Sequence, residues 1–516
     1  MNNLLVLYAG NPASYAFEPL FNGKNAVELS VEQAKKFPGV KKTVLLACGG
    51  DFSFLNEVEI EQKDWTKRSL LEKISNLQSD FDCIYFAFAD CPLLDPVLAG
   101  KIAQRHINYS AEYSYADGWP FGIAPETLSP GTAGILAKIM GDDDGPVERD
   151  LLFSVIQKDI NAFDIEAEIS EVDLRCHRLN LCADNKRNFT LLKNFITAAG
   201  NKIPDASQIE RIIEEQPGIL RTLPSFYPVQ VYGGCPQKCS ICPYPAFTDS
   251  QARKDFMDSG KFNSLLDKII SFSDDAVIDL SLWGELSLHP EKMKLIEDVI
   301  AHNELSLIIE TSGLGWKDDE LEKCAVLSQN AGKRKNPLPP VSWIVSLDSA
   351  DSKRYAELRG AGFAQAESCA KKLLSLFPKD CYVQAVRVKD GEDDTEKFYR
   401  YWKEASPNGE RNIIIQKYDD FCGSLTKRQA SDISPVIRQP CWHIMRDLPV
   451  LLNGDVPLCR EDLSVFKDGS KRLLGNVFSD SLENIWQNGD KYYREQCKKC
   501  YAQICENCDE YYTYNF

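Results

Sequence analysis

Three cysteines fall within eight positions in the stretch VYGGCPQKCSICPYP, at Cys235, Cys239 and Cys242. Clustered thiolates are ligands for zinc or for iron–sulfur clusters. A closed zinc site needs four protein ligands, and no partner stands near these three in the sequence. Three thiolates on a [4Fe–4S] cluster leave one iron open to an exogenous ligand. The spacing therefore favours such a cluster, and a zinc site or reduced structural thiols are the alternative.

A second group of cysteines lies near the C-terminal end, in CKKCYAQICENC, at Cys497, Cys500, Cys505 and Cys508. The chain has 18 cysteines among 516 residues. In a reducing compartment, clustered thiols are better explained by metal or cluster ligation than by disulfides. Taken alone, the paired Cys-x2-Cys units indicate a zinc ribbon, so both readings stay open at this point.

The elements that position the first group are predicted between residues 226 and 416, where short β-rich runs alternate with amphipathic helical stretches. The strand candidates are YPVQVYG, AVIDLSLWG, LSLIIET, SWIVSLD, YVQAVRV and NIIIQK. Strand–helix units in series predict a parallel sheet, either a curved partial barrel or an open doubly wound sheet. Function gathers at the C-terminal ends of such strands, and the three-cysteine motif follows the first one.

The rest of the chain divides into regions of different pattern. Residues 1–200 contain strand-like runs that end in small or acidic residues, which predicts a second α/β unit. Residues 201–225 predict a helical connector, residues 226–420 the core just described, and residues 421–516 a small cysteine-rich domain. In that last domain the periodicity breaks down, as expected where metal ligation replaces a large core.

Composition limits the possible partners. The formal net charge is −17, which is poorly suited to neutralising nucleic-acid phosphates. No stretch approaches about 20 uninterrupted apolar residues, so no transmembrane helix is expected. The N-terminal apolar run lacks a basic leading segment and is too short for a signal peptide. We therefore expect a cytoplasmic protein that binds neither nucleic acid nor membrane.

The motif Cys-x3-Cys-x2-Cys after a first strand resembles that of the radical S-adenosylmethionine enzymes. The resemblance implies a partial (β/α)6 barrel in which S-adenosylmethionine completes the cluster and yields a 5′-deoxyadenosyl radical. Further matches lie at the later strand ends, in LSLWGELSLHP, IIETSGLG, WIVSLDSADSKRYAELRG and VQAVRVKD. The cofactor-binding residues that the resemblance implies are Gly284, Glu285, Thr311, Ser312, Ser346, Asp348, Arg359, Gln384 and Arg387.

The region after residue 421 resembles the SPASM extension, which holds one or two auxiliary [4Fe–4S] clusters. The order Cys441-x12-Gly454-x4-Cys459, a Gly-Asn turn and the SLENIW helix carry this resemblance. It implies a first cluster on Cys441, Cys459 and Cys508, and a second on Cys497, Cys500 and Cys505. The final cysteine of the family pattern is absent, so His443, Asp509 or Cys422 are candidates for a missing ligand.

The N-terminal region resembles the sugar cytidylyltransferases and related nucleotidyltransferases. FAFADCPLLDP, YSYADGWPFGIAPETL and CHRLNLCADNKRNF carry this resemblance. It implies roles for Asp90, Gly122, Glu126 and Asp184, with Asp90 helping to hold Mg²⁺ on a nucleotide, a task suited to carboxylate. The glycine-rich loop of active members also has Arg and Lys, whereas YAGNPASYAFEPLFNGK has only Lys24. We therefore expect a nucleotidyltransferase-like fold that binds a nucleotide or sugar without catalysing transfer, with an active cytidylyltransferase and a purely structural domain as the alternatives.

The whole chain resembles the spirochaete-type SPASM proteins. This implies a radical enzyme that abstracts hydrogen from a peptide or protein substrate, with a flavodoxin- or ferredoxin-like electron donor. Two alternatives remain open. The radical chemistry could act on a small molecule, such as a sugar or nucleotide-linked substrate presented by the N-terminal domain. The chain could instead be a nucleotide-sugar cytidylyltransferase whose clusters sense redox state.

Overall fold

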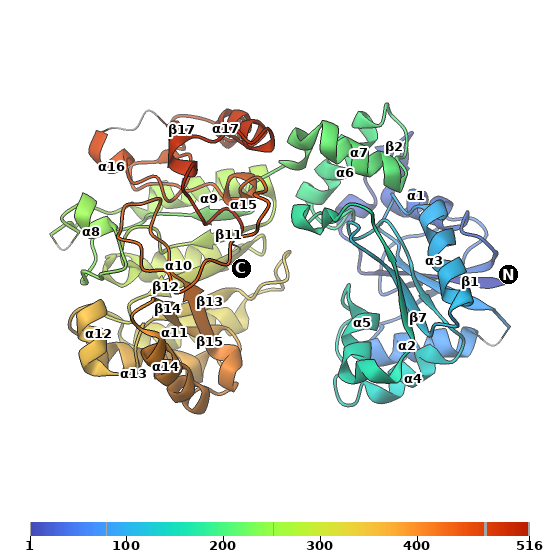
Figure 1. The fold of residues 1–516 in the computed structure, drawn as a ribbon, viewed down its shortest axis with the longest axis horizontal. Coiled ribbons are helices and arrows are strands. Elements are labelled where there is room, and N and C mark those ends of the chain that lie inside the picture. The colour runs from blue at the N-terminus through green and yellow to red at the C-terminus, as the bar shows by residue number, and fades with distance from the viewer. Residues whose placement is uncertain (1, 79, 251, 469–471, 514–516) are drawn as a thin grey trace. The chain divides into compact units, whose positions relative to one another are not determined.

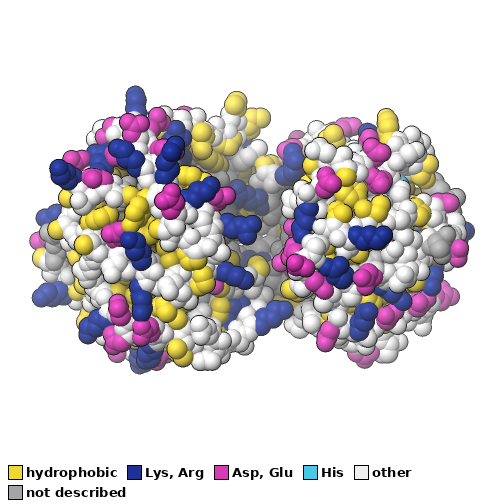
Figure 2. Space-filling model, turned by 90° about the horizontal axis from the view of Figure 1, so that it is seen from below, with side chains coloured by type: hydrophobic (Ala, Val, Ile, Leu, Met, Phe, Trp, Pro, Cys, Tyr) yellow, Lys and Arg dark blue, Asp and Glu magenta, His cyan; other side chains and the backbone are white. Residues whose placement is uncertain are grey.

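The computed structural model describes all residues except 1, 79, 251, 469–471 and 514–516. The chain forms two compact units, Met1–Thr222 and Leu223–Phe516, and Figure 1 shows both. Within the described residues, no helix has the length and apolar character that crossing a membrane requires. Acidic and basic side chains are interspersed over the visible face of each unit (Figure 2).

The first unit is built on a seven-stranded mixed sheet in the order β5-β4-β1-β6-β8-β7-β9. All pairs are parallel except those of β8, which runs antiparallel to β6 and β7. The central strands β1 and β6 are apolar and almost wholly buried, as expected for strands covered on both faces. The strands are β1 Asn3–Gly10, β4 Val40–Ala47, β5 Glu59–Gln62, β6 Cys83–Phe88, β7 Tyr113–Asp117, β8 Glu126–Leu128 and β9 Ile165–Ile169.

Helices and one small hairpin complete this unit. The hairpin pairs β2 (Pro19–Phe21) with β3 (Lys24–Asn25). Helix α7 lies in the stretch where a connector is predicted, and it belongs to the first unit. The helices are α1 Ala26–Ala34, α2 Lys67–Leu77, α3 Pro96–Asn108, α4 Thr132–Ile139, α5 Leu151–Ile156, α6 Lys186–Ala198 and α7 Ala206–Glu215.

The second unit contains a six-stranded sheet in which the strands follow one another in chain order and every pair is parallel. This confirms the predicted partial barrel. The strands are β10 Phe226–Pro228, β11 Ala276–Asp279, β12 Leu305–Thr311, β13 Val341–Ser346, β14 Cys381–Arg387 and β15 Ile413–Lys417. The helices are α8 Tyr244–Phe247, α9 Ser259–Ser273, α10 Lys292–Ile300, α11 Asp318–Asn330, α12 Ser352–Leu358, α13 Phe363–Leu376 and α14 Glu392–Ala405.

Strand β10 is shorter than its apolar sequence predicts, and it pairs with residues 447–450 as well as with β11. Phe226 and Val229 form parallel bridges with Asp447 and Val450, and Gln230 N donates to the Val450 carbonyl at 2.8 Å. The first barrel strand therefore lies against the C-terminal region. Both regions share one hydrophobic core, to which Val229, Val450 and Trp486 belong.

The C-terminal region has little regular structure, as its sequence predicts. The SLENIW segment begins a helix at Leu482, where the Ser481 hydroxyl accepts a hydrogen bond from Asn484 N at 3.2 Å. The described elements of this region are α15 Trp442–Arg446, β16 Asp455–Pro457, α16 Val465–Asp468, β17 Leu473–Asn476 and α17 Leu482–Cys497.

Candidate active site and cysteine clusters

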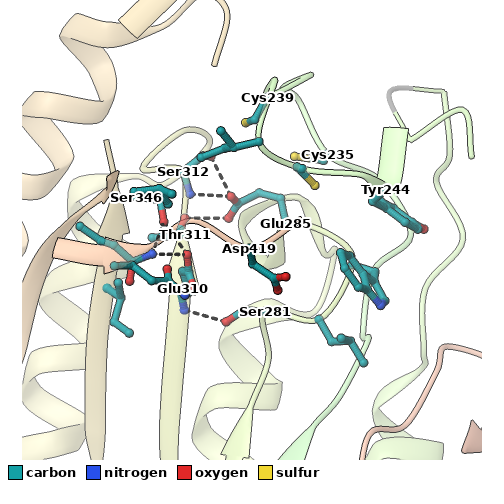
Figure 3. A pocket seen from close by; sticks show the side chains of 18 of the residues that line it. Cys235, Cys239, Tyr244, Ser281, Glu285, Glu310, Thr311, Ser312, Ser346 and Asp419 are labelled. Atoms are coloured by element: carbon teal, nitrogen blue, oxygen red, sulfur yellow. Dashed lines mark hydrogen bonds between the residues drawn. The ribbon is translucent and has the colours of Figure 1, made fainter. Parts of the chain in front are cut away.

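A cavity of about 310 Å³ lies at the C-terminal ends of the barrel strands. The three clustered cysteines open onto it from the loop after β10, and polar residues from β11 to β14 form its walls (Figure 3). The residues implied by sequence that line it are Cys235, Cys239, Cys242, Gly284, Glu285, Thr311, Ser312, Ser346, Arg359 and Gln384. Asp348 and Arg387 are not among the lining residues.

The backbone of the cysteine loop is fixed at several points. Cys235 N donates to the Ser250 carbonyl at 2.9 Å, and Ser240 N donates to the Leu358 carbonyl at 2.7 Å. Burial raises the pKa of Cys235 and of Cys242 to about 12. Without a bound cation these thiols would stay protonated at neutral pH. A bound metal or cluster lowers the pKa of its thiol ligands and would hold them as thiolates.

Gly284 and Glu285 connect the cysteine loop to the third strand. A β-carbon on Gly284 would lie 1.8 Å from the Tyr232 carbonyl oxygen, so only glycine fits there. The Glu285 carboxylate accepts hydrogen bonds from the Thr311 hydroxyl at 2.7 Å and from Ser312 N at 2.8 Å (Figure 3). Glu285 N donates to the Gly234 carbonyl at 2.9 Å. Glu285 therefore connects its own segment of the cavity wall by hydrogen bonds to the cysteine loop and to the end of β12.

Asp348 and Arg359 form a buried ion pair that contacts the cysteine loop through Gln237. Arg359 Nη1 donates to Asp348 Oδ2 at 2.5 Å, and Arg359 Nε donates to Gln237 Oε1 at 3.2 Å. The other Asp348 oxygen accepts from Val386 N at 2.8 Å. Both carboxylate oxygens of Asp348 are thus used within the protein. Gln237 lies between Cys235 and Cys239, so the pair fixes the loop that carries the cysteines.

The strand ends hold a second hydrogen-bonded group, centred on a residue that the sequence analysis missed. Glu310 Oε1 accepts from the Ser346 hydroxyl at 2.5 Å and from Gln384 Nε2 at 2.8 Å. Glu310 stands in IIETSGLG, at the end of a predicted strand, and this position is the sequence signal that could have identified it as a site residue. Arg387, by contrast, donates to Glu392 at 2.8 Å at the surface, away from the lining residues.

The part of the cavity nearest the C-terminal region is rich in carboxylates. Asp279, Asp419 and Glu461 line it together with Arg460. Burial raises the pKa of Asp279 to about 6. Arg460 Nε donates to Glu461 Oε1 at 2.9 Å, and Asp419 is a further side-chain hydrogen-bond partner of Glu461. Asp419 and Glu461 were missed because they lie outside any periodic segment.

Five cysteines of the C-terminal region lie near one another. The Cys422 thiol contacts Cys508, and Cys459 and Cys505 each interact electrostatically with Cys441 and Cys508. Of the other candidate ligands, His443 lies 2.6 Å from Asp447 Oδ2 through Nδ1 and 3.2 Å from Thr513 Oγ1 through Nε2, and Asp509 pairs with Lys417 at 3.0 Å. Cys497 ends helix α17 and Cys500 is exposed.

In the first unit, the implied acidic residues lie against cationic or phenolic donors. Arg149 donates to both oxygens of Asp90, at 2.7 and 2.6 Å, and reaches Asp184 at 3.4 Å. The Tyr113 hydroxyl donates to Glu126 at 2.5 Å, and burial raises the pKa of Glu126 to about 7. Gly122 has φ +91° and lies close to the Leu181 carbonyl, an approach that favours glycine.

Comparison with known proteins identifies the C-terminal region and one close relative. Residues 441–509 match the SPASM iron–sulfur cluster-binding domain. An uncharacterized protein of Treponema pallidum (strain Nichols) is 32% identical over 374 residues, which is 71% of this chain and 98% of the relative.

Two solved structures are similar at low identity. Streptococcus suis SuiB bound to the precursor peptide SuiA is 14% identical, with 54% of this chain and 68% of SuiB covered and a TM-score of 0.40. A cytidylyltransferase from Leptospira borgpetersenii is 15% identical, with 43% of this chain and 97% of that chain covered and a TM-score of 0.36.

The parallel half-barrel and the Cys-x3-Cys-x2-Cys loop have the form that the resemblance to radical S-adenosylmethionine enzymes predicts, and residues 441–509 match an iron–sulfur cluster-binding domain. The chain belongs to the same family as this Treponema pallidum protein.

Proposed function

We propose that this protein is a radical S-adenosylmethionine enzyme that abstracts hydrogen from a peptide or protein substrate. The observation that carries the proposal is that Cys235, Cys239 and Cys242 open onto the same cavity as the polar ends of strands β11 to β14. When a reduced [4Fe–4S] cluster and S-adenosylmethionine are bound there, they supply a 5′-deoxyadenosyl radical that takes a hydrogen atom from the substrate.

The residues of the cavity wall suit a cofactor that carries ammonium, carboxylate and ribose groups. Glu285 provides a negative charge beside Cys235 and holds Thr311 and Ser312 in place. Ser346 and Gln384 are oriented by Glu310, so their polar groups have fixed directions before any ligand binds. Such preorganisation lowers the cost of ordering the site on binding.

The substrate lies, in this proposal, toward the C-terminal region. Asp419 and Glu461 face the cavity there, and burial raises the pKa of both carboxyl groups. Burying carboxylates away from water costs free energy. A hydroxyl or amine group of the substrate side chain would donate a hydrogen bond to this pair. A flavodoxin- or ferredoxin-like protein would supply the electron.

The C-terminal region holds, in this proposal, at least one auxiliary [4Fe–4S] cluster on Cys422, Cys441, Cys459 and Cys508. The contact between Cys422 and Cys508 supports this set, as does the engagement of His443 and Asp509 by other residues. One such cluster beside the radical cluster corresponds to about eight irons per chain, and a second auxiliary cluster to about twelve.

The test is the formation of 5′-deoxyadenosine by protein reconstituted without oxygen. The parent protein is incubated with S-adenosylmethionine and dithionite, and the product is measured by mass spectrometry. The variant Cys235→Ala/Cys239→Ala/Cys242→Ala should retain its C-terminal iron and form no product. Equal product from the parent and this variant would reject the proposal.

A further inference from the structure

The two acidic residues that resemble a magnesium site in the first unit are bridged by an arginine of the same chain. Arg149 Nη1 and Nη2 donate to the two oxygens of Asp90 at 2.7 and 2.6 Å, in a bidentate pair. Nη2 also lies 3.4 Å from Asp184 Oδ2. One guanidinium therefore stands between the two carboxylates, where a divalent cation would have to bind.

The oxygens of Asp184 have further donors. Oδ1 accepts from Asn188 Nδ2 at 2.8 Å and from Asn185 Nδ2 at 3.0 Å. Oδ2 is shared between Arg149 and Asn180 Nδ2, each at 3.4 Å. All four carboxylate oxygens thus have a donor from the protein. Mg²⁺ requires oxygen ligands at about 2.0–2.1 Å in near-octahedral geometry, and it could bind here only by displacing these donors.

Aromatic contacts hold Arg149 in this position. Its guanidinium carbon lies 4.6 Å from the centroid of the Phe88 ring and 5.9 Å from that of Phe121. Cation–π contacts of this kind stabilise a charged guanidinium that lies over the face of an aromatic ring. Phe88 ends strand β6 immediately before the Asp90 segment. The arginine is therefore fixed both by the carboxylates and by the strand that presents one of them.

The other neighbours of this group are also unsuited to magnesium. Cys91 and Cys182 lie 3.2 Å apart, sulfur to sulfur, and the Cys91 thiol is 3.8 Å from Asp90 Oδ1. Both cysteines are buried. Mg²⁺ prefers oxygen ligands and avoids thiols. The residues present at this site do not fit the cation that the sequence resemblance implies.

We propose that Arg149 replaces the divalent cation in the first unit. It bridges the segments that carry Asp90 and Asp184, and the unit does not transfer nucleotides through a metal bridge. Any phosphate-bearing ligand of this unit must then be bound without a bridging Mg²⁺. This inference concerns the first unit alone and does not depend on the radical chemistry proposed for the second.

Manganese binding to the full-length, metal-free protein tests the proposal, with free Mn²⁺ measured by electron paramagnetic resonance. The parent and Asp184→Asn should bind the same number of Mn²⁺ ions, because Asp184 is not a metal ligand in the parent. Arg149→Met should gain one site, and Arg149→Met/Asp184→Asn should lose it again. The matched control is Arg105→Met, which removes another arginine that pairs with two carboxylates, those of Glu166 and Glu168.

Each outcome of the Mn²⁺ binding experiment either supports or overturns the proposal. A new site in Arg149→Met that binds Mn²⁺ at least tenfold more tightly than any gained by Arg105→Met supports the proposal. Loss of one Mn²⁺ from the parent on Asp184→Asn overturns it, as does a folded Arg149→Met that gains no site. If Arg149→Met does not fold, the comparison of the parent with Asp184→Asn decides alone. Equal numbers of bound Mn²⁺ ions in the two proteins support the proposal, and one ion fewer in Asp184→Asn overturns it.

Discussion

Replacing Asp348 by Asn should destabilise the second unit and loosen its hold on iron. The Asp348 side chain is 1% exposed and that of Arg359 is 10% exposed, so the charge pair is shielded from water. Removing one charge from a buried pair costs about 3–5 kcal/mol, because the other charge remains buried without a counterion. Asn also has only one oxygen, so its amide nitrogen would face a donor, either Arg359 Nη1 or Val386 N.

The consequence should extend to the cysteine loop. Arg359 holds Gln237, whose Nε2 also donates to the Tyr355 hydroxyl at 2.8 Å. When Arg359 loses its counterion, it no longer has a fixed position from which to hold Gln237. We expect the reconstituted Asp348→Asn protein to lose about four irons, the content of one cluster, faster than the parent during gel filtration without oxygen.

Urea unfolding followed by tryptophan fluorescence measures the first effect, since six of the eight tryptophans lie after residue 223. The matched control is Asp351→Asn on the same loop, where the carboxylate caps helix α12 by accepting from Lys353 N and Arg354 N. Asn caps helices about as well as Asp, so this variant should lose under about 1 kcal/mol. An Asp348→Asn protein no less stable than Asp351→Asn, with the same rate of iron loss, would refute the reasoning.

Three further predictions follow from the geometry. Cys422→Ala should lose about four irons per chain whereas the exposed Cys500→Ala should not; equal iron in both variants, measured colorimetrically, would contradict the proposed ligand set. Glu285→Gln should weaken S-adenosylmethionine binding at least tenfold in calorimetry with iron content unchanged, and unaltered affinity would argue against its place in the site. Burial lowers the pKa of His106 to about 4; the unfolded chain takes up that proton near pH 6.5, so stability should fall by about 3 kcal/mol as the pH falls from 6.5 to 4. Urea unfolding followed by circular dichroism at both pH values should show a smaller fall for His106→Gln, and an equal fall would assign the effect to other groups.

The barrel could be predicted because its strands are short apolar runs separated by amphipathic helices, a pattern that tertiary structure did not override. The role of Asp348 was harder to predict from the sequence. It follows the fourth strand, as a cofactor-binding residue would, but its φ of +62° accompanies a turn that directs the carboxylate to Val386 N and Arg359. No local pattern encodes that turn.

The lack of a local sequence pattern also explains why some residues of the sites were not predicted. Asp419, Glu461 and Arg149 lie in irregular segments, so no periodicity marks them, and their partners are distant in the sequence. Asp90 could be identified from its strand end, but its pairing with Arg149 joins positions 59 residues apart. Such contacts depend on how the chain folds back, which one sequence does not specify.

Gln230 connects the cavity at the strand ends to the C-terminal region. It is 1% exposed, and its Nε2 donates to the Trp283 carbonyl at 2.8 Å and to the Tyr244 hydroxyl at 3.0 Å. Trp283 precedes Gly284, and Tyr244 follows Cys242 by two positions. Its Oε1 accepts from Leu452 N at 3.2 Å, in the SPASM domain. One buried amide thus sets the position of the cysteine loop, the second strand end and the auxiliary domain together. Because each of these bonds shares the same side chain, a shift of the SPASM domain must also shift the segments that carry Cys242 and Gly284.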